Sequence, residues 1–250
     1  MTPTLAQVAQ LAGVSEITAS RVIRGAPNVS ARTARKVEAA AQTIGYVQNR
    51  VAGALAGASS NQVGVILPSL SNIVFPDVLK GLEDCLEASG YHPVLGISHY
   101  DSVREEKLIR SLLSWRPAGI AIAPSGLSKA SSRLLQNVAC PVVEIMDLVD
   151  DPIDITVGIS HRDAGRETAR HVVSLGYRRF AFLGHDISVD RRALARLAGF
   201  REGLAEAGHA VERTILLDRP SSVSLGREAI RALLSETSHP ALAYFSNDDM

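Results

Sequence analysis

Cysteine is scarce in this sequence: Cys85 and Cys140 are the two that its 250 residues contain. They lie far apart and form no Cys-X-X-Cys pair, so the sequence offers neither a thiolate zinc site nor a redox-active dithiol. Free cysteine packs as a small hydrophobic residue. We therefore expect both side chains to lie in the core of a protein from a reducing compartment.

Long apolar runs are missing as well. No stretch approaches the roughly 18 uninterrupted apolar residues of a membrane-spanning helix. The N-terminus, MTPTLAQVAQLAG, has neither the basic segment nor the apolar core of a secretory signal. Because 46% hydrophobic residues are too many for a disordered chain, we predict a folded, cytoplasmic protein that has more than one core and no membrane partner.

Net charge is the third absence, since 26 basic and 26 acidic side chains cancel. Neutrality argues against a nucleic-acid partner, because domains that bind nucleic acid usually carry a basic excess. The charges are unevenly distributed, however. Residues 1–60 carry six basic and two acidic side chains, a net charge of +4, and the rest of the chain carries −4. This asymmetry indicates a basic binding module joined to a second part.

Three short helices are predicted in the basic segment. Apolar residues at helical spacing predict helices over Leu5 to Ala12, Glu16 to Arg24 and Ser30 to Ile44. Gly13-Val14 separates the first two, and Ser15 is a suitable N-cap for the second. A tight turn followed by a capped helix is typical of a helix-turn-helix.

The second of these helices is the candidate for reading DNA. Its first exposed positions, Glu16, Ile17 and Arg21, suit a cytosine amino group, a thymine methyl group and guanine O6 and N7 respectively. The alternative is a helical hairpin that serves only for packing. Periodicity alone does not separate the two.

After Gln62, short β-rich runs alternate with helical stretches. The predicted strands are Val63 to Leu67, His92 to Ile97, Gly119 to Ala123, Val142 to Met146, Ile155 to Ile159, Arg179 to Leu183, Ile215 to Leu217 and Leu242 to Phe245. The predicted helices are Phe75 to Ser89, Ser102 to Ser114, Ser128 to Asn137, Asp163 to Leu175, Arg191 to Glu206 and Ser224 to Ser235. This alternation predicts mostly parallel sheets covered by helices.

Such sheets bind ligands in the loops that leave the carboxyl ends of their strands. Those loops are polar here: Pro68 to Asn72, Asp147, His185-Asp186 and Ser246 to Asp249. Because the sequence stops just after the last of them, we expect the second α/β subdomain to be incomplete.

The run from Thr4 to Gly57 resembles the headpiece of the lactose/galactose-repressor family of bacterial transcription regulators. The matching elements are Val8-Ala9, Ala12 to Ser15, Thr18, Ser20 to Val22, Val29-Ser30, Val37, Gly45-Tyr46 and Asn49-Arg50. The resemblance implies an all-α helix-turn-helix headpiece (residues 1–48) and an α/β core like that of periplasmic sugar-binding proteins (residues 62–250, in two parallel-sheet subdomains, 62–159 and 160–250). The expected DNA-binding residues are Thr4, Ser15, Glu16, Ile17, Thr18, Ser20, Arg21, Asn28, Ser30, Tyr46, Asn49, Arg50 and Leu55.

The resemblance also implies a hinge helix from Asn49 to Gly57, within a linker over residues 49–61. It assigns Leu55 to the minor groove, where an apolar wedge kinks the duplex. About nine residues with Gly53 among them are too few for a stable isolated helix, so we expect the segment to fold only on DNA. A plain flexible linker is the alternative. The family commonly has proline where this sequence has Gln48.

Six residues of the core are expected to bind an effector. Arg196 begins the run RLAGF, which matches the family motif whose arginine holds the sugar. The alternative is a surface arginine paired with an acid. Asn247 matches a second effector position, against the alternative of an ordinary polar turn. Asp147 matches a third effector position, and the alternative is that it belongs to a solvated acidic loop. The full set is Ser69, Asn72, Phe75, Asp147, Arg196 and Asn247.

Four segments, Gly64 to Glu83, Ser111 to Trp115, Pro141 to Asp147 and Asp154 to His161, resemble repressors of gluconate-utilisation genes. That likeness implies gluconate or a related aldonate as effector, with Arg196 at the carboxylate. The expected protein is a homodimeric repressor of a palindromic operator. It has no cofactor.

Two other classes compete with the repressor. A sugar-binding module without DNA regulation would have a secretory signal in place of the helix-turn-helix. An α/β enzyme with an appended helix-turn-helix would need a catalytic motif, and the sequence has no nucleophile elbow, phosphate-binding loop or HEXXH helix. His161 and His185 lie beside carboxylates, yet such pairs are common as solvated loop residues or helix caps. We therefore expect no enzyme.

Overall fold

The computed structural model of the chain describes residues 2–27, 29–47, 60–236 and 238–250. The chain divides into two compact units, residues 1–58 and residues 59–250. The predicted hinge helix lies outside the described residues, and so do four of the expected DNA contacts: Asn28, Asn49, Arg50 and Leu55.

The N-terminal unit contains the three predicted helices, α1 (Leu5–Ala12), α2 (Glu16–Ile23) and α3 (Ala31–Ile44). Each begins at a hydroxyl N-cap that accepts a hydrogen bond from the backbone N–H three residues later: Thr4, Ser15 and Ser30. Gly13 and Gly45 end α1 and α3 in the left-handed conformation, with φ of 67° and 65°.

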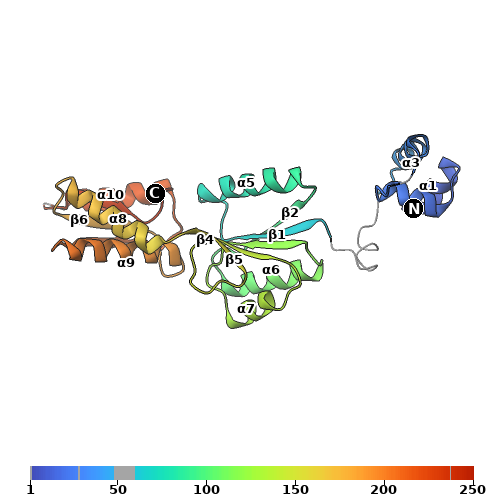
Figure 1. Cartoon of the computed structure of the whole chain (residues 1–250). Coiled ribbons are helices and arrows are strands. Elements are labelled where there is room, and N and C mark those ends of the chain that lie inside the picture. The colour runs from blue at the N-terminus through green and yellow to red at the C-terminus, as the bar shows by residue number, and fades with distance from the viewer. Residues whose placement is uncertain (1, 28, 48–59, 237) are drawn as a thin grey trace. The chain divides into compact units, whose positions relative to one another are not determined.

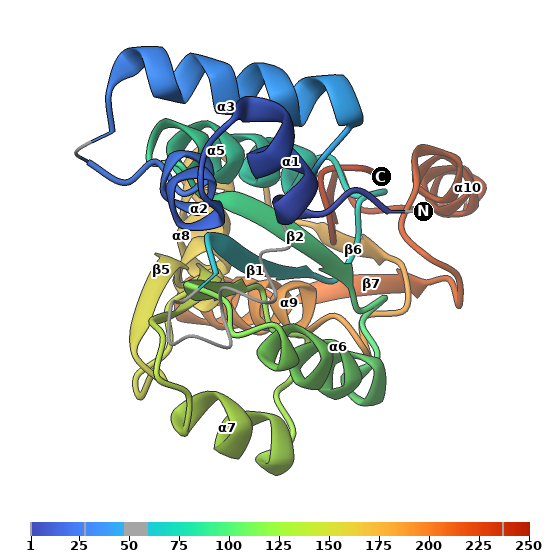
Figure 2. The same ribbon diagram turned by 90° about the vertical axis from the view of Figure 1, so that its right-hand side faces the viewer.

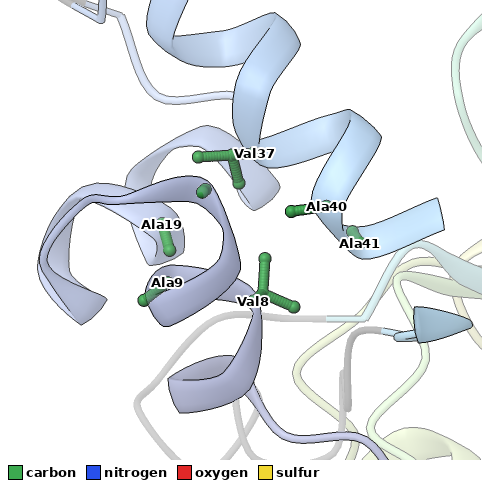
Figure 3. Close-up of a cluster of buried hydrophobic side chains, with 7 residues drawn as sticks. Val8, Ala9, Ala19, Val37, Ala40 and Ala41 are labelled. Carbon is green, nitrogen blue, oxygen red and sulfur yellow. The ribbon is translucent and has the colours of Figure 1, made fainter. Parts of the chain in front are cut away.

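Small side chains form the core of this unit (Figure 3). Its buried residues are alanines and valines: Val8, Ala9, Ala12, Ala19, Val37, Ala40 and Ala41. Because these side chains are small, the three helices pack closely and bury little apolar surface. The outer face of α2 is therefore left for other contacts.

The C-terminal unit begins with a five-stranded parallel sheet, the first lobe, in the order β2-β1-β3-β4-β5. Its strands are β1 (Gln62–Leu67), β2 (His92–Ile97), β3 (Gly119–Ile122), β4 (Val142–Asp147) and β5 (Ile155–Ile159). Helix α5 (Val74–Ala88) covers one face, and α6 (Ser102–Ser114) and α7 (Lys129–Gln136) cover the other (Figures 1 and 2). Along β1 the alternation is direct, because Val65 and Leu67 pack under α5 whereas Ile66 packs toward α6 and α7.

The second lobe has a three-stranded parallel sheet in the order β7-β6-β8. Its strands are β6 (Phe180–Gly184), β7 (Val211–Leu216) and β8 (Leu242–Phe245). Phe180 and Phe182 of the central strand pack toward α8 (His161–Ser174) and α9 (Arg191–Glu206). Ala181 and Leu183 pack toward α10 (Val223–Leu234) on the opposite face.

Helices α8 and α9 are in backbone contact through three glycines. A Cβ atom on Gly199 would overlap the carbonyl oxygen of Arg162, and one on Gly165 would overlap that of Arg196. Gly203 meets the carbonyl of Arg166 in the same way. The glycine of the RLAGF run therefore has a physical role, since it brings the start of α8 against the arginine of α9.

The predicted parallel-sheet fold of the core is confirmed, with two differences in detail. Strand β7 begins at Val211 rather than Ile215, because an edge strand needs no continuous apolar run and its outer residues are polar. Cys85 is exposed and Cys140 is only partly buried, so the prediction of two core cysteines was wrong for Cys85. The apolar stripe of α5 passes through Val78 and Leu82 and leaves Cys85 on the outer side.

Candidate functional site

Helix α2 presents a polar face with one apolar residue on it. Ile17 is 73% exposed, and Glu16 and Arg21 are exposed beside it. Ala19 is buried on the opposite side. A single exposed apolar residue is common on protein surfaces, but here it shares the exposed side of α2 with a carboxylate and a guanidinium, which can bond to base edges. The arrangement suits a helix that lies in a DNA major groove.

The other expected DNA contacts have structural duties in this unit. Ser15 Oγ lies 2.9 Å from Thr18 Oγ1 while it caps α2, and Thr4 and Ser30 cap α1 and α3. Ser20 is half-buried on α2. Tyr46 packs partly against the core. Capped helix ends still carry free backbone N–H groups, which favour phosphate.

Five basic residues of this unit are exposed: Arg21, Arg24, Arg32, Arg35 and Lys36. Within the part of the unit that the structure describes, none of them forms an ion pair with Glu16 or Glu38. Unpaired surface cations of this kind attract the phosphate backbone without sequence preference.

The C-terminal unit contains a cleft between its two lobes, where loops from the carboxyl ends of the strands meet. Two adjoining cavities of about 560 and 410 Å³ share Asn72, Tyr100, Asp190 and Asn247 in their walls. Five of the six predicted effector residues line one or both cavities: Asn72, Phe75, Arg196 and Asn247 line the larger, and Ser69 lines the smaller. Asp147 contacts two residues of the larger cavity wall. The structure thus brings together residues that are up to 178 positions apart, Ser69 and Asn247.

Arg196 of α9 holds the second lobe's side of the cleft. Its Nη2 donates to the backbone carbonyl of Ser246 at 2.6 Å and to Asn247 Oδ1 at 2.5 Å. Its Nη1 lies 2.9 Å from His161 Nδ1. All of these acceptors are neutral, and no carboxylate within the described residues forms an ion pair with this guanidinium. The alternative of a surface arginine paired with an acid is therefore wrong.

His161 is neutral, and its tautomer follows from its partners. Because a guanidinium only donates, Nδ1 must accept from Arg196, and Nε2 carries the proton and donates to the carbonyl of Met146 at 3.1 Å. Burial lowers the pKa of His161, and the nearby charge of Arg196 lowers it further. Of the two expected alternatives, a solvated loop residue or a helix cap, the first is wrong for His161, since its side chain is 9% exposed at the first position of α8.

Asp147, at the end of β4, is ion-paired across the cleft. Its Oδ2 lies 2.5 Å from Arg192 Nη2, and its Oδ1 lies 3.4 Å from His161 Nε2. The same Arg192 nitrogen donates to the carbonyl of Pro124 at 3.2 Å. The alternative of a solvated acidic loop therefore does not describe Asp147.

Asp190 organises the second lobe's end of the cleft. As N-cap of α9 it accepts from the backbone N–H groups of Arg192 and Ala193, both at 3.0 Å. His185 Nε2 lies 3.3 Å from it, and Asn247 Nδ2 donates to it at 3.3 Å. Burial opposes its charge, yet hydrogen bonds from His185 and Ala193 and the charges of His185 and Arg196 hold the pKa of Asp190 well below its ordinary value. His185 is likewise buried, so it is not a solvated loop residue.

The first lobe supplies the opposite wall. Asn72 Oδ1 accepts from the N–H of Val74 at 3.2 Å, and Ser69 Oγ accepts from the N–H of Ser71 at 3.0 Å. Phe75 is buried at the start of α5. Tyr100 faces both cavities, and burial, followed by the charge of Asp190, raises the pKa of its hydroxyl.

Sequence reasoning missed His161, Asp190, Arg192 and Tyr100 as parts of this site. One signal was available for Arg192, because it precedes Arg196 by four residues in a predicted helix and so shares its face. The other three carry no local pattern. Their roles depend on partners that the fold brings from distant segments.

Two family models match the chain. The model for bacterial regulatory proteins of the lacI family matches residues 4–49. The model for periplasmic binding proteins and the sugar binding domain of the LacI family matches residues 60–250. A helix-turn-helix-type transcriptional regulator GntR from Pseudomonas aeruginosa is 39% identical over 249 residues, which cover 99% of this chain and 72% of the relative.

Solved structures give the same assignment. The crystal structure of a LacI-family transcriptional regulator from Silicibacter pomeroyi is 44% identical, with a TM-score of 0.92 over 98% of this chain and 74% of that one. A crystal structure of the lac repressor dimer bound to operator and the anti-inducer ONPF is 27% identical, with a TM-score of 0.82 over 100% of this chain and 75% of that one. Among the described residues, no helix is long and apolar enough to cross a membrane.

Proposed function

The chain belongs to the LacI family of bacterial regulatory proteins, and we propose that gluconate or a related aldonate controls its affinity for a palindromic operator. It is a transcription regulator with a helix-turn-helix domain and a sugar-binding domain, and it is not an enzyme. In this proposal it acts in the cytoplasm as a homodimer, with one N-terminal unit on each half of the operator.

The observation that carries the choice of effector is the charge of Arg196. Its guanidinium faces a cleft and bonds only to neutral acceptors. A planar guanidinium of this kind is the preferred partner of a carboxylate. The likeness of four segments to repressors of gluconate-utilisation genes supports the same ligand.

The other predicted residues receive roles that fit their surroundings. Ser69, Asn72 and Asn247 offer hydroxyl and amide groups to the hydroxyls of an aldonate, and Phe75 lies against its carbon chain. Asp147 is engaged with Arg192, so we assign it the role of holding that arginine rather than of binding hydroxyls.

In the N-terminal unit, α2 enters the major groove with Glu16, Ile17 and Arg21 toward the base edges. Thr4, Ser15, Thr18, Ser20, Ser30 and Tyr46 lie toward the backbone of the DNA. Asn28, Asn49, Arg50 and Leu55 complete the interface, with Leu55 in the minor groove. We infer that the two lobes adopt two relative positions with different operator affinities. An effector changes operator affinity only if it binds one of these positions better than the other, and an effector that binds both equally well changes nothing.

The test is a titration of the 250-residue chain on a duplex that it selects from a random library. Fluorescence anisotropy at constant salt measures operator binding with and without gluconate. Glucitol, which carries CH₂OH in place of the carboxylate, is the matched neutral ligand. We expect gluconate to shift the operator Kd at least fivefold and glucitol to leave it unchanged.

The Arg196→Gln variant is the control on the protein side. It keeps a hydrogen-bonding side chain but loses the charge, so it should bind the operator like wild type and ignore gluconate. A wild-type chain that selects no sequence contradicts the DNA-binding part of the proposal. An unchanged operator Kd at saturating gluconate contradicts the choice of effector.

A further inference from the structure

Arg192 carries the most deeply buried positive charge in the wall of the larger cavity. Its side chain is 8% exposed, and it extends from the second lobe to two groups of the first, Asp147 and the carbonyl of Pro124. Burying a guanidinium is costly unless its charge and its donors are matched. Asp147 therefore neutralises it.

The donors of Arg192 are only partly satisfied. Both of its cross-lobe bonds come from Nη2, and its Nε is buried without a hydrogen-bond partner. A guanidinium has five N–H donors in a planar fork, which matches two carboxylate oxygens. Asp147 contacts only Nη2, so the pair of parallel N–H groups that could bind both oxygens of a carboxylate is only partly used.

Arg196 lies one helical turn further along α9, and both arginines face the same cavity of about 560 Å³. His161 lies between Arg196 and Asp147, and its Nδ1 faces the guanidinium of Arg196 as a hydrogen-bond acceptor. The cavity thus has two guanidinium groups on one wall. One of them already holds a carboxylate of the protein.

We propose that Arg192 and Arg196 together bind the carboxylate of the effector, and that Asp147 occupies Arg192 until an anionic ligand takes its place. This inference rests on the proposed function, since it concerns the same cleft. It names Arg192 as the residue that makes the response specific for an anion.

The proposal explains how a neutral sugar is rejected. A hydroxyl does not compensate the charge of a buried guanidinium, so a neutral ligand leaves the ion pair with Asp147 in place. The carboxylate of an aldonate replaces the negative charge of Asp147 and accepts hydrogen bonds from two N–H groups of Arg192. The exchange also removes a cross-lobe bond, because Asp147 belongs to the first lobe and Arg192 to the second.

Two variants separate this role from a structural one, and they change gluconate affinity in opposite directions. Arg192→Gln removes the charge, and we expect isothermal titration calorimetry to give a gluconate Kd at least tenfold higher than wild type. Asp147→Asn removes the competing carboxylate, and we expect a Kd at least threefold lower. Arg201→Gln, an exposed arginine on the same helix, is the matched control and should bind like wild type.

The outcomes are distinct. A wild-type chain that does not bind gluconate overturns the proposed function itself. If wild type binds, an unchanged Kd in Arg192→Gln overturns the role of Arg192, and weaker binding by Asp147→Asn shows that Asp147 contacts the ligand instead of competing with it. Arg192→Lys, which keeps the charge and a side chain of similar length, covers the case in which Arg192→Gln does not fold; it should retain a preference for gluconate over glucitol.

Discussion

Side-chain hydrogen bonds in the N-terminal unit join near neighbours, whereas several of those in the cleft join distant segments. Among the described residues of the first unit, the partners are three or four positions apart, as for Ser15 and Thr18 or Arg24 and Ser20. In the cleft, Arg196 and His161 are 35 positions apart, His185 and Ser246 are 61, and Arg192 and Pro124 are 68.

The two units also treat charge differently. The first exposes its basic residues on a small core of alanine and valine, and the second buries Arg192 and Asp190 inside a hydrogen-bonded network. A surface that meets phosphate needs accessible cations, because solvated charges cost the fold little. A cleft that selects one small ligand needs groups held in fixed positions. The first site therefore tolerates local change, and the second depends on the packing of a whole lobe.

The largest effect is expected where helices α8 and α9 touch. In Gly199→Ala the new methyl group would overlap the carbonyl of Arg162, which is backbone and cannot move aside. We expect a loss of about 3 kcal/mol in the stability of the C-terminal unit. Hydrogen exchange measured by mass spectrometry on the intact chain follows each unit separately, and exchange in residues 2–47 should be unchanged.

Gly81→Ala is the control for that substitution. Gly81 also lies in a helix, α5, but nothing lies within 4 Å of a Cβ built on it. Alanine should be neutral or stabilising there, because it has the higher helix propensity. If Gly199→Ala and Gly81→Ala show equal hydrogen exchange, α8 and α9 separate at little cost in free energy. That result would contradict the view that their close contact fixes the position of Arg196.

The fold was predictable where burial is continuous. Central strands such as β1 and β6 are unbroken apolar runs, and their positions were predicted to within a residue. The start of β7 was missed because an edge strand carries polar residues on its outer side. In the same way, the α2 face is visible in the sequence because Glu16, Ile17 and Arg21 are neighbours on one helix.

The place of the cleft was predictable from the polar loops that follow the strands, but individual ligand residues were predictable only through the family motifs around Arg196, Asn247 and Asp147. Nothing local marks Asp190 or His161 as buried, because a charged or polar residue is buried only where the fold supplies partners for it. Those partners lie on other strands and helices. Physical reasoning on a single sequence therefore finds a contiguous site and misses most of a dispersed one.

The second prediction concerns the exposed face of α2. Arg21→Ala should weaken binding to the selected operator by about tenfold, and binding to unrelated DNA much less, because a base contact carries sequence information. Arg24→Ala is the matched control, since its guanidinium donates to the carbonyl of Ser20 on its own helix. A uniform loss on all sequences in Arg21→Ala would reassign this arginine to the phosphate backbone.

A smaller effect is expected from the cap of the same helix. Ser15→Ala removes the acceptor for the N–H of Thr18, and we expect about 1 kcal/mol less protection from hydrogen exchange in residues 2–47. Ser20→Ala, within α2, should change protection by a few tenths of a kcal/mol at most. Exchange in the C-terminal unit should be the same in both variants, and a change there would contradict the independence of the two units.

The smallest effect is a proton linked to the effector. Burial, and then the charge of Arg196, lowers the pKa of His161 below its ordinary value, while Asp147 opposes this less strongly. An anion in the cleft adds negative charge and raises that pKa, so binding takes up protons. A group whose pKa is higher in the complex than in the free protein strengthens binding as the pH falls.

We therefore expect gluconate affinity to rise about threefold between pH 7.5 and pH 6, and glucitol affinity to stay constant. Calorimetry in two buffers with different ionisation enthalpies measures the proton uptake directly. In His161→Gln the uptake should vanish while gluconate still binds through the arginines. If the uptake persists in this variant, another group takes up the proton, and His185, which lies beside Asp190, is the next residue to substitute. That outcome would not contradict the proposed carboxylate site.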